Sequence, residues 1–216
     1  KLIVGKTCIV TGANSGIGRS TAITLAKNDY TVFATMRSLE RGEKLKGIAQ
    51  ELNLVIKAVE LDVSDTDSVN QGINEILDQT DQIDVLINNA GVGSNAVIED
   101  VDIESDKSVF ETNFWGVVRC IQAVLPTMRQ QKSGHIIQVS SIAGRVGLPA
   151  QPIYSATTWA LEGLSENLAH ELSSFGVRVS IIEPGVTRTS ILGKNITVPQ
   201  IDDFESIYAR MLDMYM

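Results

Sequence analysis

Residues 6–18 read KTCIVTGANSGIG, and they combine three structural signals in thirteen positions. Residues 6–10 are a short, β-branched apolar run, which is typical of a buried strand. Three glycines follow at the spacing Gly-x-x-x-Gly-x-Gly, and an apolar helical pattern begins among them. Glycine lets the backbone approach a ligand, and a helix N-terminus presents N–H groups to phosphate. We therefore predict strand, glycine turn and helix holding a dinucleotide pyrophosphate, with a purely structural turn as the alternative.

The alternation of apolar runs and helical patterns continues along the chain. Further strands are predicted over residues 30–36, 55–59, 84–87, 134–139 and 177–182, and helices over 39–52, 65–78, 105–131 and 154–174. Ser64 is the predicted N-cap of the helix over 65–78. Six strands separated by helices predict an α/β, doubly wound, Rossmann-like parallel sheet in the order 3-2-1-4-5-6.

Beyond the sixth strand the pattern changes. Residues 190–201 lack clear periodicity and are predicted to be a loop on the substrate side, followed by a helix over 202–216. No seventh strand is predicted. No repeat or linker is visible, so we predict one dinucleotide-binding oxidoreductase domain over residues 1–216.

Composition restricts the classes of partner. The formal net charge is −8 and the isoelectric point is about 4.8, which disfavours binding to nucleic acid or anionic membranes. The longest apolar runs are about four residues, far below the ~20 that span a bilayer. No segment resembles a signal peptide, so we expect a cytoplasmic protein without a membrane span.

Cysteine and histidine spacing does not predict a metal site. Cys8 and Cys120 match no zinc spacing and are predicted to be reduced, buried thiols. His135 and His170 have no metal-ligating residue at a suitable spacing, and both are predicted to be structural.

The end of the second predicted strand bears on the choice of cofactor. In dinucleotide-binding folds a carboxylate at this point accepts a hydrogen bond from the ribose 2′-hydroxyl. This chain has Met36 and then Arg37 there. A guanidinium without a competing carboxylate favours a 2′-phosphate, and the Ser15 hydroxyl would add a contact. We therefore expect NADP(H) to be favoured over NAD(H), the alternative being that Arg37 is a solvated loop charge.

Hydroxyl groups gather after the fifth predicted strand. Ser140 and Ser141 end that strand, and Tyr154 follows Ser141 by thirteen residues, near the start of a helix. This distance allows the loop to fold back and bring two hydroxyls onto one substrate oxygen. Asn113 lies in the middle of the long helix over 105–131, where asparagine is a poor helix former. A functional reason is expected there, the alternative being a satisfied buried polar group.

These motifs resemble the short-chain dehydrogenase/reductase family. That family has a serine, about thirteen residues, and then Tyr-x-x-x-Lys; the tetrapeptide at residues 88–91, Asn-Asn-Ala-Gly, is also characteristic of it. The resemblance covers residues 6–190 and implies that Tyr154 donates a proton, that Ser141 polarises the same oxygen, and that Asn113 lies where a local kink frees a carbonyl that binds water. It also implies a homodimer or homotetramer, formed through the two long helices.

The resemblance also supplies a set of cofactor contacts. In this sequence they are Gly12, Ser15, Gly16, Ile17, Gly18, Arg37, Asp62, Val63, Asn89, Ala90, Gly91, Tyr154, Thr158, Pro184, Gly185 and Thr189. Asp62 is implied to meet the adenine amino group, the alternative being an ordinary cap at a strand end. Thr189 is implied to lie beside the nicotinamide carboxamide.

One position departs from the family pattern: the fourth residue after Tyr154 is Thr158, where the family has lysine. The family lysine favours tyrosinate and holds ribose hydroxyls, and a threonine cannot supply its charge. Lys107, Lys132 and Lys194 are replacements only in principle. Three explanations stay open: an introduced substitution that disables a reductase, a natural enzyme of low activity, or an NADP-binding sensor or subunit without turnover.

The expected substrate is a small carbonyl compound or alcohol. Its contacts are expected from residues 92–104, from 142–152 and from the loop after residue 189. Apolar residues in the last two of these segments hint at an apolar substrate; they are Ile142, Val146, Leu148, Pro149, Ile191 and Leu192.

Overall fold

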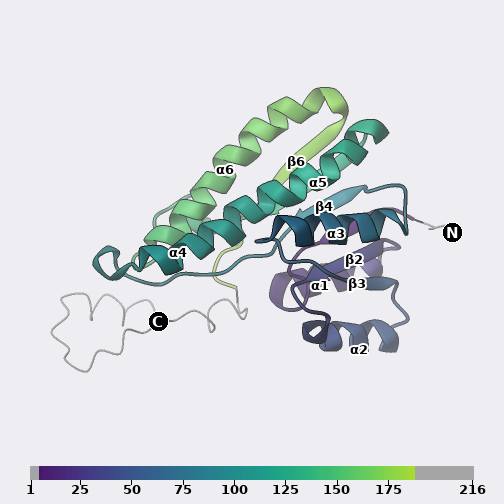
Figure 1. Cartoon of the computed structure of the whole chain (residues 1–216), viewed down its shortest axis with the longest axis horizontal. Coiled ribbons are helices and arrows are strands. Elements are labelled where there is room, and N and C mark those ends of the chain that lie inside the picture. The colour runs from purple at the N-terminus through teal and green to yellow at the C-terminus, as the bar shows by residue number, and fades with distance from the viewer. Residues whose placement is uncertain (1–4, 188–216) are drawn as a thin grey trace.

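The computed structural model describes residues 5–187, and its centre is one six-stranded sheet (Figure 1). Every neighbouring pair of strands is parallel, and the strand order is β3-β2-β1-β4-β5-β6. The strands are β1 (Thr7–Val10), β2 (Thr31–Met36), β3 (Ile56–Glu60), β4 (Val85–Asn88), β5 (Gly134–Val139) and β6 (Val177–Ile182). The predicted doubly wound sheet and its strand order are confirmed.

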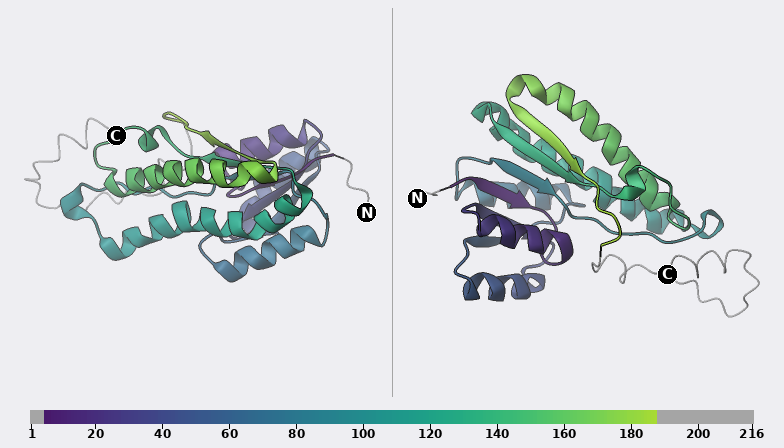
Figure 2. Two further views of the ribbon diagram at one scale, coloured as in Figure 1. Left: turned by 90° about the horizontal axis from the view of Figure 1, so that it is seen from above. Right: turned by 180° about the vertical axis from the view of Figure 1, so that it is seen from behind.

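Helices cover both faces of the sheet (Figures 1 and 2). On one face lie α1 (Gly16–Ala26) and α2 (Glu43–Glu51). On the other lie α3 (Thr66–Leu77), α5 (Gly116–Gln131) and α6 (Pro152–Leu172), with the short α4 (Ile103–Phe110) leading into α5. Two 3₁₀ turns extend these helices, at Leu39–Gly42 before α2 and at Ser173–Phe175 after α6. Two further 3₁₀ turns, Ile98–Asp100 and Ile142–Gly144, lie in loops after β4 and β5.

Three expectations about the helices need correction. The helix expected over 39–52 is a 3₁₀ turn followed by α2, and the helix expected over 105–131 is α4 and α5 joined by a π-helical turn at Glu111–Trp115. The N-cap of α3 is Asp65 rather than Ser64, because the Asp65 carboxylate accepts hydrogen bonds from the backbone N–H groups of Asp67 and Ser68.

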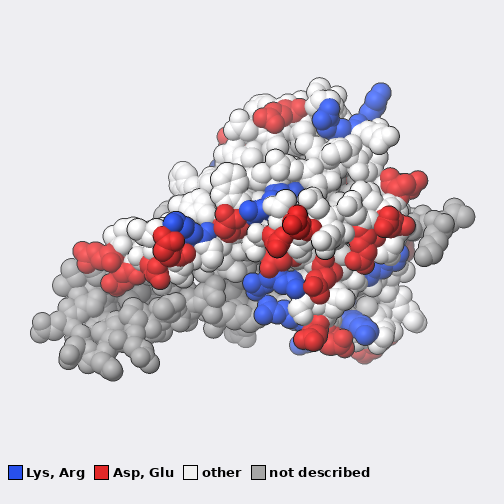
Figure 3. Space-filling model, in the orientation of Figure 1, with Lys and Arg blue, Asp and Glu red and all other residues white. Residues whose placement is uncertain are grey.

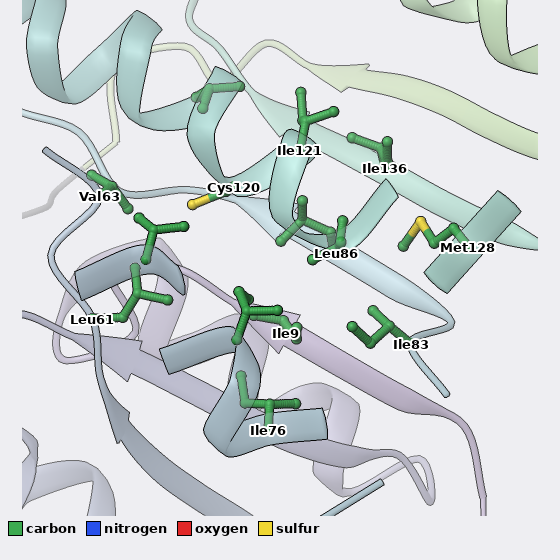
Figure 4. Close-up of a cluster of buried hydrophobic side chains, with 14 of the residues drawn as sticks. Ile9, Leu61, Val63, Ile76, Ile83, Leu86, Cys120, Ile121, Met128 and Ile136 are labelled. Atoms are coloured by element: carbon green, nitrogen blue, oxygen red, sulfur yellow. The ribbon is translucent and has the colours of Figure 1, made fainter. Parts of the chain in front are cut away.

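The larger core lies between the sheet and the helices α3, α5 and α6 (Figure 4). Ile9 and Leu86 from the central strands are fully buried against Ile76 of α3 and Cys120 of α5. A smaller core, which includes Val10, packs the other face against α1 and α2. Since both faces of the central strands are covered, β1 and β2 are apolar or β-branched throughout and buried at every position.

The carboxyl ends of the parallel strands share one edge of the sheet, and every predicted site residue in the described part of the chain lies in a loop or helix at this edge. Thr189, the loop over 190–201 with Ile191, Leu192 and Lys194, and the helix over 202–216 lie outside the described residues.

Candidate active site

The glycine turn after β1 is fastened to the end of β4 by Thr11 and Asn89. The Thr11 hydroxyl oxygen accepts hydrogen bonds from the backbone N–H groups of Asn89 and Ala90, at 2.9 and 3.0 Å. In return the Asn89 side-chain amide donates to the carbonyl oxygen of Thr11 at 2.9 Å. Asn88 likewise donates to the Gln138 side chain on β5 at 2.9 Å. Asn88 and Asn89 thus tie neighbouring strands together.

The glycine positions of the turn and of the start of α1 require glycine, because of close contacts or of backbone conformation. Gly12 has φ +64, and a Cβ atom there would lie 2.8 Å from the Cα atom of Ala90. Gly16, the first residue of α1, has φ +53, and glycine adopts this left-handed conformation without steric cost. A Cβ atom at Gly18 would lie 2.6 Å from the carbonyl oxygen of Gly12 and would also collide with the Asn89 amide. The start of α1 is thus held directly against the strand ends.

Gly12, Gly16 and Gly18 form a glycine cradle that fits the pyrophosphate of a dinucleotide. The first N–H groups of an α-helix have no partner within the helix, and in α1 they belong to the predicted contacts Gly16, Ile17 and Gly18. Ser15 is the N-cap residue, in an extended conformation. The chain therefore offers N–H donors and a helix dipole at the position where a phosphate would be held.

Arg37 and Asp62 flank the cradle at the ends of β2 and β3. Arg37 is exposed immediately after β2, and among residues 5–187 it forms no ion pair. The Asp62 Oδ1 atom accepts hydrogen bonds from the backbone N–H and the hydroxyl of Ser64, at 2.9 and 2.7 Å. Both bonds end on Oδ1, so the Oδ2 atom of Asp62 takes no part in them.

Asn113 lies in the π-helical turn between α4 and α5, where a local departure from α geometry is predicted. Its side-chain Oδ1 accepts from the backbone N–H of Val92, and its Nδ2 donates to the carbonyl oxygen of Val92, both at 2.9 Å. Nδ2 also lies 3.2 Å from the Thr157 hydroxyl oxygen. Asn113 therefore joins three segments: the loop after β4, the π-helical turn and α6. Such π-helical turns inside helices are frequent at functional sites.

Tyr154 lies in the first turn of α6 and is half-buried. The two threonines that follow bond back to the helix. The Thr157 hydroxyl donates to the carbonyl oxygen of Tyr154 at 2.8 Å, and the Thr158 hydroxyl donates to that of Ser155 at 2.8 Å. Thr158 is 5% exposed. Its single hydroxyl proton is therefore engaged within the helix, and it is not presented to a ribose in this conformation.

Ser141 begins the short turn Ile142–Gly144, and the end of β6 holds it on both sides. The N–H of Ser140 donates to the carbonyl oxygen of Ile182 at 2.8 Å, and that of Ile142 donates to the carbonyl oxygen of Pro184 at 3.0 Å. The Ser141 Oγ atom accepts from the N–H of Ala143 at 3.2 Å. Because Oγ acts as the acceptor, its own proton is available for a ligand oxygen.

An ion pair reinforces this junction between the loops after β5 and β6. Arg145 contacts the Glu183 Oε1 atom through Nη2 at 2.7 Å and Nε at 2.9 Å, and its Nη2 lies 3.5 Å from Glu162 on α6. The hydrogen bond from Arg145 lowers the pKa of the Glu183 carboxyl, and the same bond raises the pKa of Arg145. Pro184 and Gly185, two predicted cofactor contacts, directly follow this carboxylate.

The cysteines and histidines lie apart from this arrangement. Cys8 and Cys120 are buried free thiols, and burial raises the pKa of Cys120 to about 12, so both predictions of buried thiols are confirmed. The His135 Nε2 atom lies 2.9 Å from the Ser180 hydroxyl across the β5–β6 pair, and burial lowers its pKa. Within residues 5–187 no group of three potential metal ligands occurs.

Several contributors were missed in the sequence. Thr11 and Thr157 act through hydrogen bonds to residues far away in the chain, and Arg145 meets acids at positions 162 and 183. The position of Thr11 directly before the glycine turn was the one feature of the sequence that could have indicated its role. Arg145 carried no such signal, because its partners follow no helical or strand spacing.

Of the lysines considered as substitutes for the missing cation, Lys107 and Lys132 lie within the described residues. Lys107 pairs with Glu104 at 2.7 Å on α4. Lys132 caps the C-terminal end of α5, and the whole of that helix separates it from the π-helical turn.

Comparison with known proteins places this geometry in a family. The family described as short chain dehydrogenase matches residues 6–198. The chain belongs to the short-chain dehydrogenase family. This family match confirms the resemblance drawn from the Ser141–Tyr154 spacing and the tetrapeptide at 88–91.

Relatives of known name are oxidoreductases. The chain is 38% identical over 199 residues to oxidoreductase BOA17 of Botryotinia fuckeliana, covering 92% of this chain and 72% of that protein. It is 40% identical over 193 residues to retinol dehydrogenase 8 of Bos taurus, covering 88% of this chain and 61% of that protein. The chain thus spans only part of these relatives' length.

Solved structures that share the fold hold either cofactor. ElxO with NADP bound superposes with a TM-score of 0.83 at 31% identity, covering 88% of this chain and 77% of ElxO. A Burkholderia phymatum member in complex with NAD gives 0.85 at 26% identity, covering 94% of this chain and 74% of that one. The family therefore accommodates both dinucleotides.

None of the described helices is long and apolar enough to cross a membrane.

The face of the molecule in Figure 3 carries acidic and basic side chains side by side. Acids gather around the start of α4; they are Glu99, Asp100, Asp102, Glu104 and Asp106.

Proposed function

We propose that the chain is an NADP(H)-dependent oxidoreductase that interconverts an apolar ketone or aldehyde and its alcohol, with turnover reduced by Thr158. The observation that carries this proposal is that α6, which bears Tyr154, packs against both the turn after Ser141 and the π-helical turn with Asn113, at the carboxyl edge that also holds the glycine cradle. The exposed Arg37 beyond β2 supports NADP(H) over NAD(H), because a guanidinium binds a 2′-phosphate through charge-assisted hydrogen bonds.

The cofactor and the side chains have separate roles in the proposed reaction. A bound nicotinamide supplies or accepts the hydride. The Ser141 hydroxyl donates a hydrogen bond to the substrate oxygen, and the Tyr154 phenol donates a proton to the same oxygen during reduction. Asn113 holds the loop at Val92 and, through Thr157, the first turn of α6, so it orients the turn that bears Tyr154.

The missing lysine sets the expected rate. Free tyrosine titrates near about 10, so at neutral pH its phenol is a weak acid unless a cation lowers its pKa. Thr158 has no charge, and its proton is bonded to Ser155. Well-placed acid–base groups contribute about 10²- to 10⁴-fold in rate, and we place the loss in this chain within that range.

Exposed apolar groups in the loops after β5 and β6 support an apolar substrate. Ile142 and Val146 are 39% and 49% exposed in the turn after β5, and Val186 is 94% exposed after β6. Exposed tryptophans support the homodimer or homotetramer: Trp115 at the π-helical turn is 48% exposed and Trp159 on α6 is 54% exposed.

The internal bond of Thr158 also supports a second candidate, an NADP-binding module without turnover, acting as a sensor or subunit.

One experiment distinguishes the oxidoreductase from the module without turnover. Calorimetric titration with NADPH and NADH tests binding, and reduction of a panel of apolar ketones and aldehydes tests turnover in the wild type and in Tyr154→Phe. The oxidoreductase proposal expects NADPH binding by both proteins and reduction by the wild type alone. Binding without turnover would favour the module, and no binding of either dinucleotide would refute both.

A further inference from the structure

Arg119 of α5 contacts two segments that lie far apart in the sequence, residues 63–66 and Glu111. Its Nε donates to the Thr66 hydroxyl at 3.1 Å, and its Nη1 lies 3.4 Å from the carbonyl oxygens of both Val63 and Glu111. Its Nη2 forms an ion pair with the Glu111 carboxylate at 2.7 Å. All three side-chain nitrogens are thus engaged, and the side chain is 22% exposed.

The two groups of partners belong to different halves of the proposed cofactor site. Val63 lies in the loop from β3 to α3, directly after Asp62, the predicted adenine contact, and Thr66 is the first residue of α3. Glu111 opens the π-helical turn that holds Asn113. The elements α3 and α5 lie side by side (Figure 1), and the guanidinium bridges the junction between them at its end nearest the sheet edge.

We infer that Arg119 is a positioning residue that couples the adenine-side loop at 62–66 to the π-helical turn at 111–115. The inference rests on the proposed function, because it takes the loop at 62–66 to line the adenine site. It does not require Arg119 to touch the cofactor or the substrate.

Two features favour a coupling role over an ordinary surface ion pair. The Glu111 carbonyl oxygen accepts the π-type bond from the N–H of Gly116, so the bond from Arg119 adds a second donor at the oxygen that defines the π turn. A Cβ atom at Gly116 would lie 2.8 Å from the Val63 side chain, so the loop and the helix touch without a spacer. A displacement of either segment is therefore transmitted directly to the other.

Only a planar guanidinium group can donate hydrogen bonds to all these acceptors at once. Arginine presents five N–H donors in fixed directions, whereas lysine is a compact point charge on a flexible stem. Arg119→Lys retains the charge beside Glu111 but cannot reach Thr66, Val63 and the Glu111 carbonyl oxygen together. Arg129→Lys is the matched control, because Arg129 lies on the same helix and its guanidinium stacks 4.7 Å above the Phe175 ring, at the opposite end of α5.

The first arm of the test needs no cofactor. Hydrogen–deuterium exchange of the free protein is compared for wild type, Arg119→Lys and Arg129→Lys. The inference expects Arg119→Lys to exchange faster than wild type, by about fivefold or more, in peptides covering both 62–66 and 111–116. The control is expected to match wild type in both. Faster exchange in only one segment, or in neither, would overturn the coupling.

The second arm measures the affinity for 2′,5′-ADP, which carries the adenosine half of NADP and no nicotinamide. Arg119→Lys is expected to bind it about fivefold or more weakly than wild type, and Arg129→Lys with unchanged affinity. Equal affinity in all three proteins would refute the link to the adenine side. If wild type binds neither 2′,5′-ADP nor NADPH, the proposed function fails, and the exchange experiment still decides whether Arg119 couples the two segments.

Discussion

The Thr158 hydroxyl donates its proton to the carbonyl oxygen of Ser155, 2.8 Å away inside α6. The residue one helical turn after Tyr154 therefore satisfies its own hydrogen-bonding need within the helix. A lysine at this position would instead bring a cation to the side of the helix that bears the phenol. Each unit by which such a charge lowers the tyrosine pKa corresponds to about 1.4 kcal/mol. Several consequences of this and of neighbouring contacts are open to experiment.

Thr158→Lys should raise the turnover of apolar ketones with NADPH by at least about tenfold, because the ammonium favours the ionised phenol. Initial rates on a ketone panel measure the change. Thr158→Met is the control, since it lengthens the side chain without adding charge and should stay near the wild-type rate. A lysine variant that binds NADPH but reduces no carbonyl would favour the module without turnover.

Arg37→Asp should weaken NADPH binding by about 10- to 100-fold and change NADH binding far less. The substitution removes charge-assisted hydrogen bonds to a 2′-phosphate and introduces a repelling carboxylate. Calorimetric titration with each dinucleotide provides the two affinities. Arg178→Asp changes the net charge equally at an exposed position on β6 and should leave the preference intact. Equal losses for NADPH and NADH would remove Arg37 from the phosphate site.

Gly18→Ala should destabilise the fold by about 1–3 kcal/mol, because its Cβ atom would collide with the Asn89 amide and lie 2.6 Å from the Gly12 carbonyl oxygen. Gly47→Ala on α2 should have the opposite sign, gaining about 0.5–1 kcal/mol, because nothing lies within 4 Å of its added Cβ. Urea unfolding measures both free energies. A neutral Gly18→Ala variant would contradict the close packing of α1 on the strand ends.

Asn113→Asp should destabilise the protein by about 2–4 kcal/mol, because the carboxylate cannot donate to the Val92 carbonyl oxygen or to Thr157 and would be buried as a charge. Thermal and chemical unfolding report the loss. Asn167→Asp is the matched control, since its amide donates to the Gly163 carbonyl oxygen on the exposed side of α6. Similar effects at the two positions would show that Asn113 does not hold the Val92 loop.

The contribution of Arg145 to stability should depend on pH. The bond from Arg145 lowers the pKa of Glu183 in the folded protein, so its stabilisation is fully present above the unfolded-state pKa of about 4. It is lost as the pH falls through the lower, folded-state pKa. The free-energy difference between wild type and Arg145→Ala should therefore be larger at neutral pH than in acid.

Denaturant unfolding at neutral and acidic pH checks this difference. Lys46→Ala serves as the comparison, because Lys46 and Glu43 form an exposed pair 3.7 Å apart on α2, and such pairs contribute little. A difference for Arg145→Ala that is the same at both pH values would show that the ion pair does not stabilise the loop junction.

Local patterns were sufficient for most of the fold. The β-branched runs and the glycine turn at 6–18 predicted buried strands and a helix start, because these features depend on residues that are neighbours in the chain. The alternation of six strands with helices then predicted a parallel sheet and its strand order. The two strands from Gly134 and Val177 were predicted with their observed bounds. The spacing of Ser141 and Tyr154, with residues 88–91, indicated the family, since each motif lies within a short stretch of the sequence. Helix detail was less accessible. Ser64 and Asp65 are both common N-cap residues, and only the hydrogen bonds to Asp65 show which of them caps α3. The family resemblance implied a kink at Asn113, but no residue pattern marked the bounds of the π-helical turn at Glu111–Trp115.

What only the tertiary structure decided is how these motifs are held together. Hydrogen bonds from Asn113 to Val92, from Arg119 to Val63 and from Arg145 to Glu183 join residues 21, 56 and 38 positions apart. Such partners share no helical or strand period, so no sequence spacing predicts them. The sequence alone placed a threonine where the family resemblance implies a lysine. Only the folded helix showed that its hydroxyl turns back onto Ser155, because side-chain direction depends on backbone geometry and on the acceptors within reach.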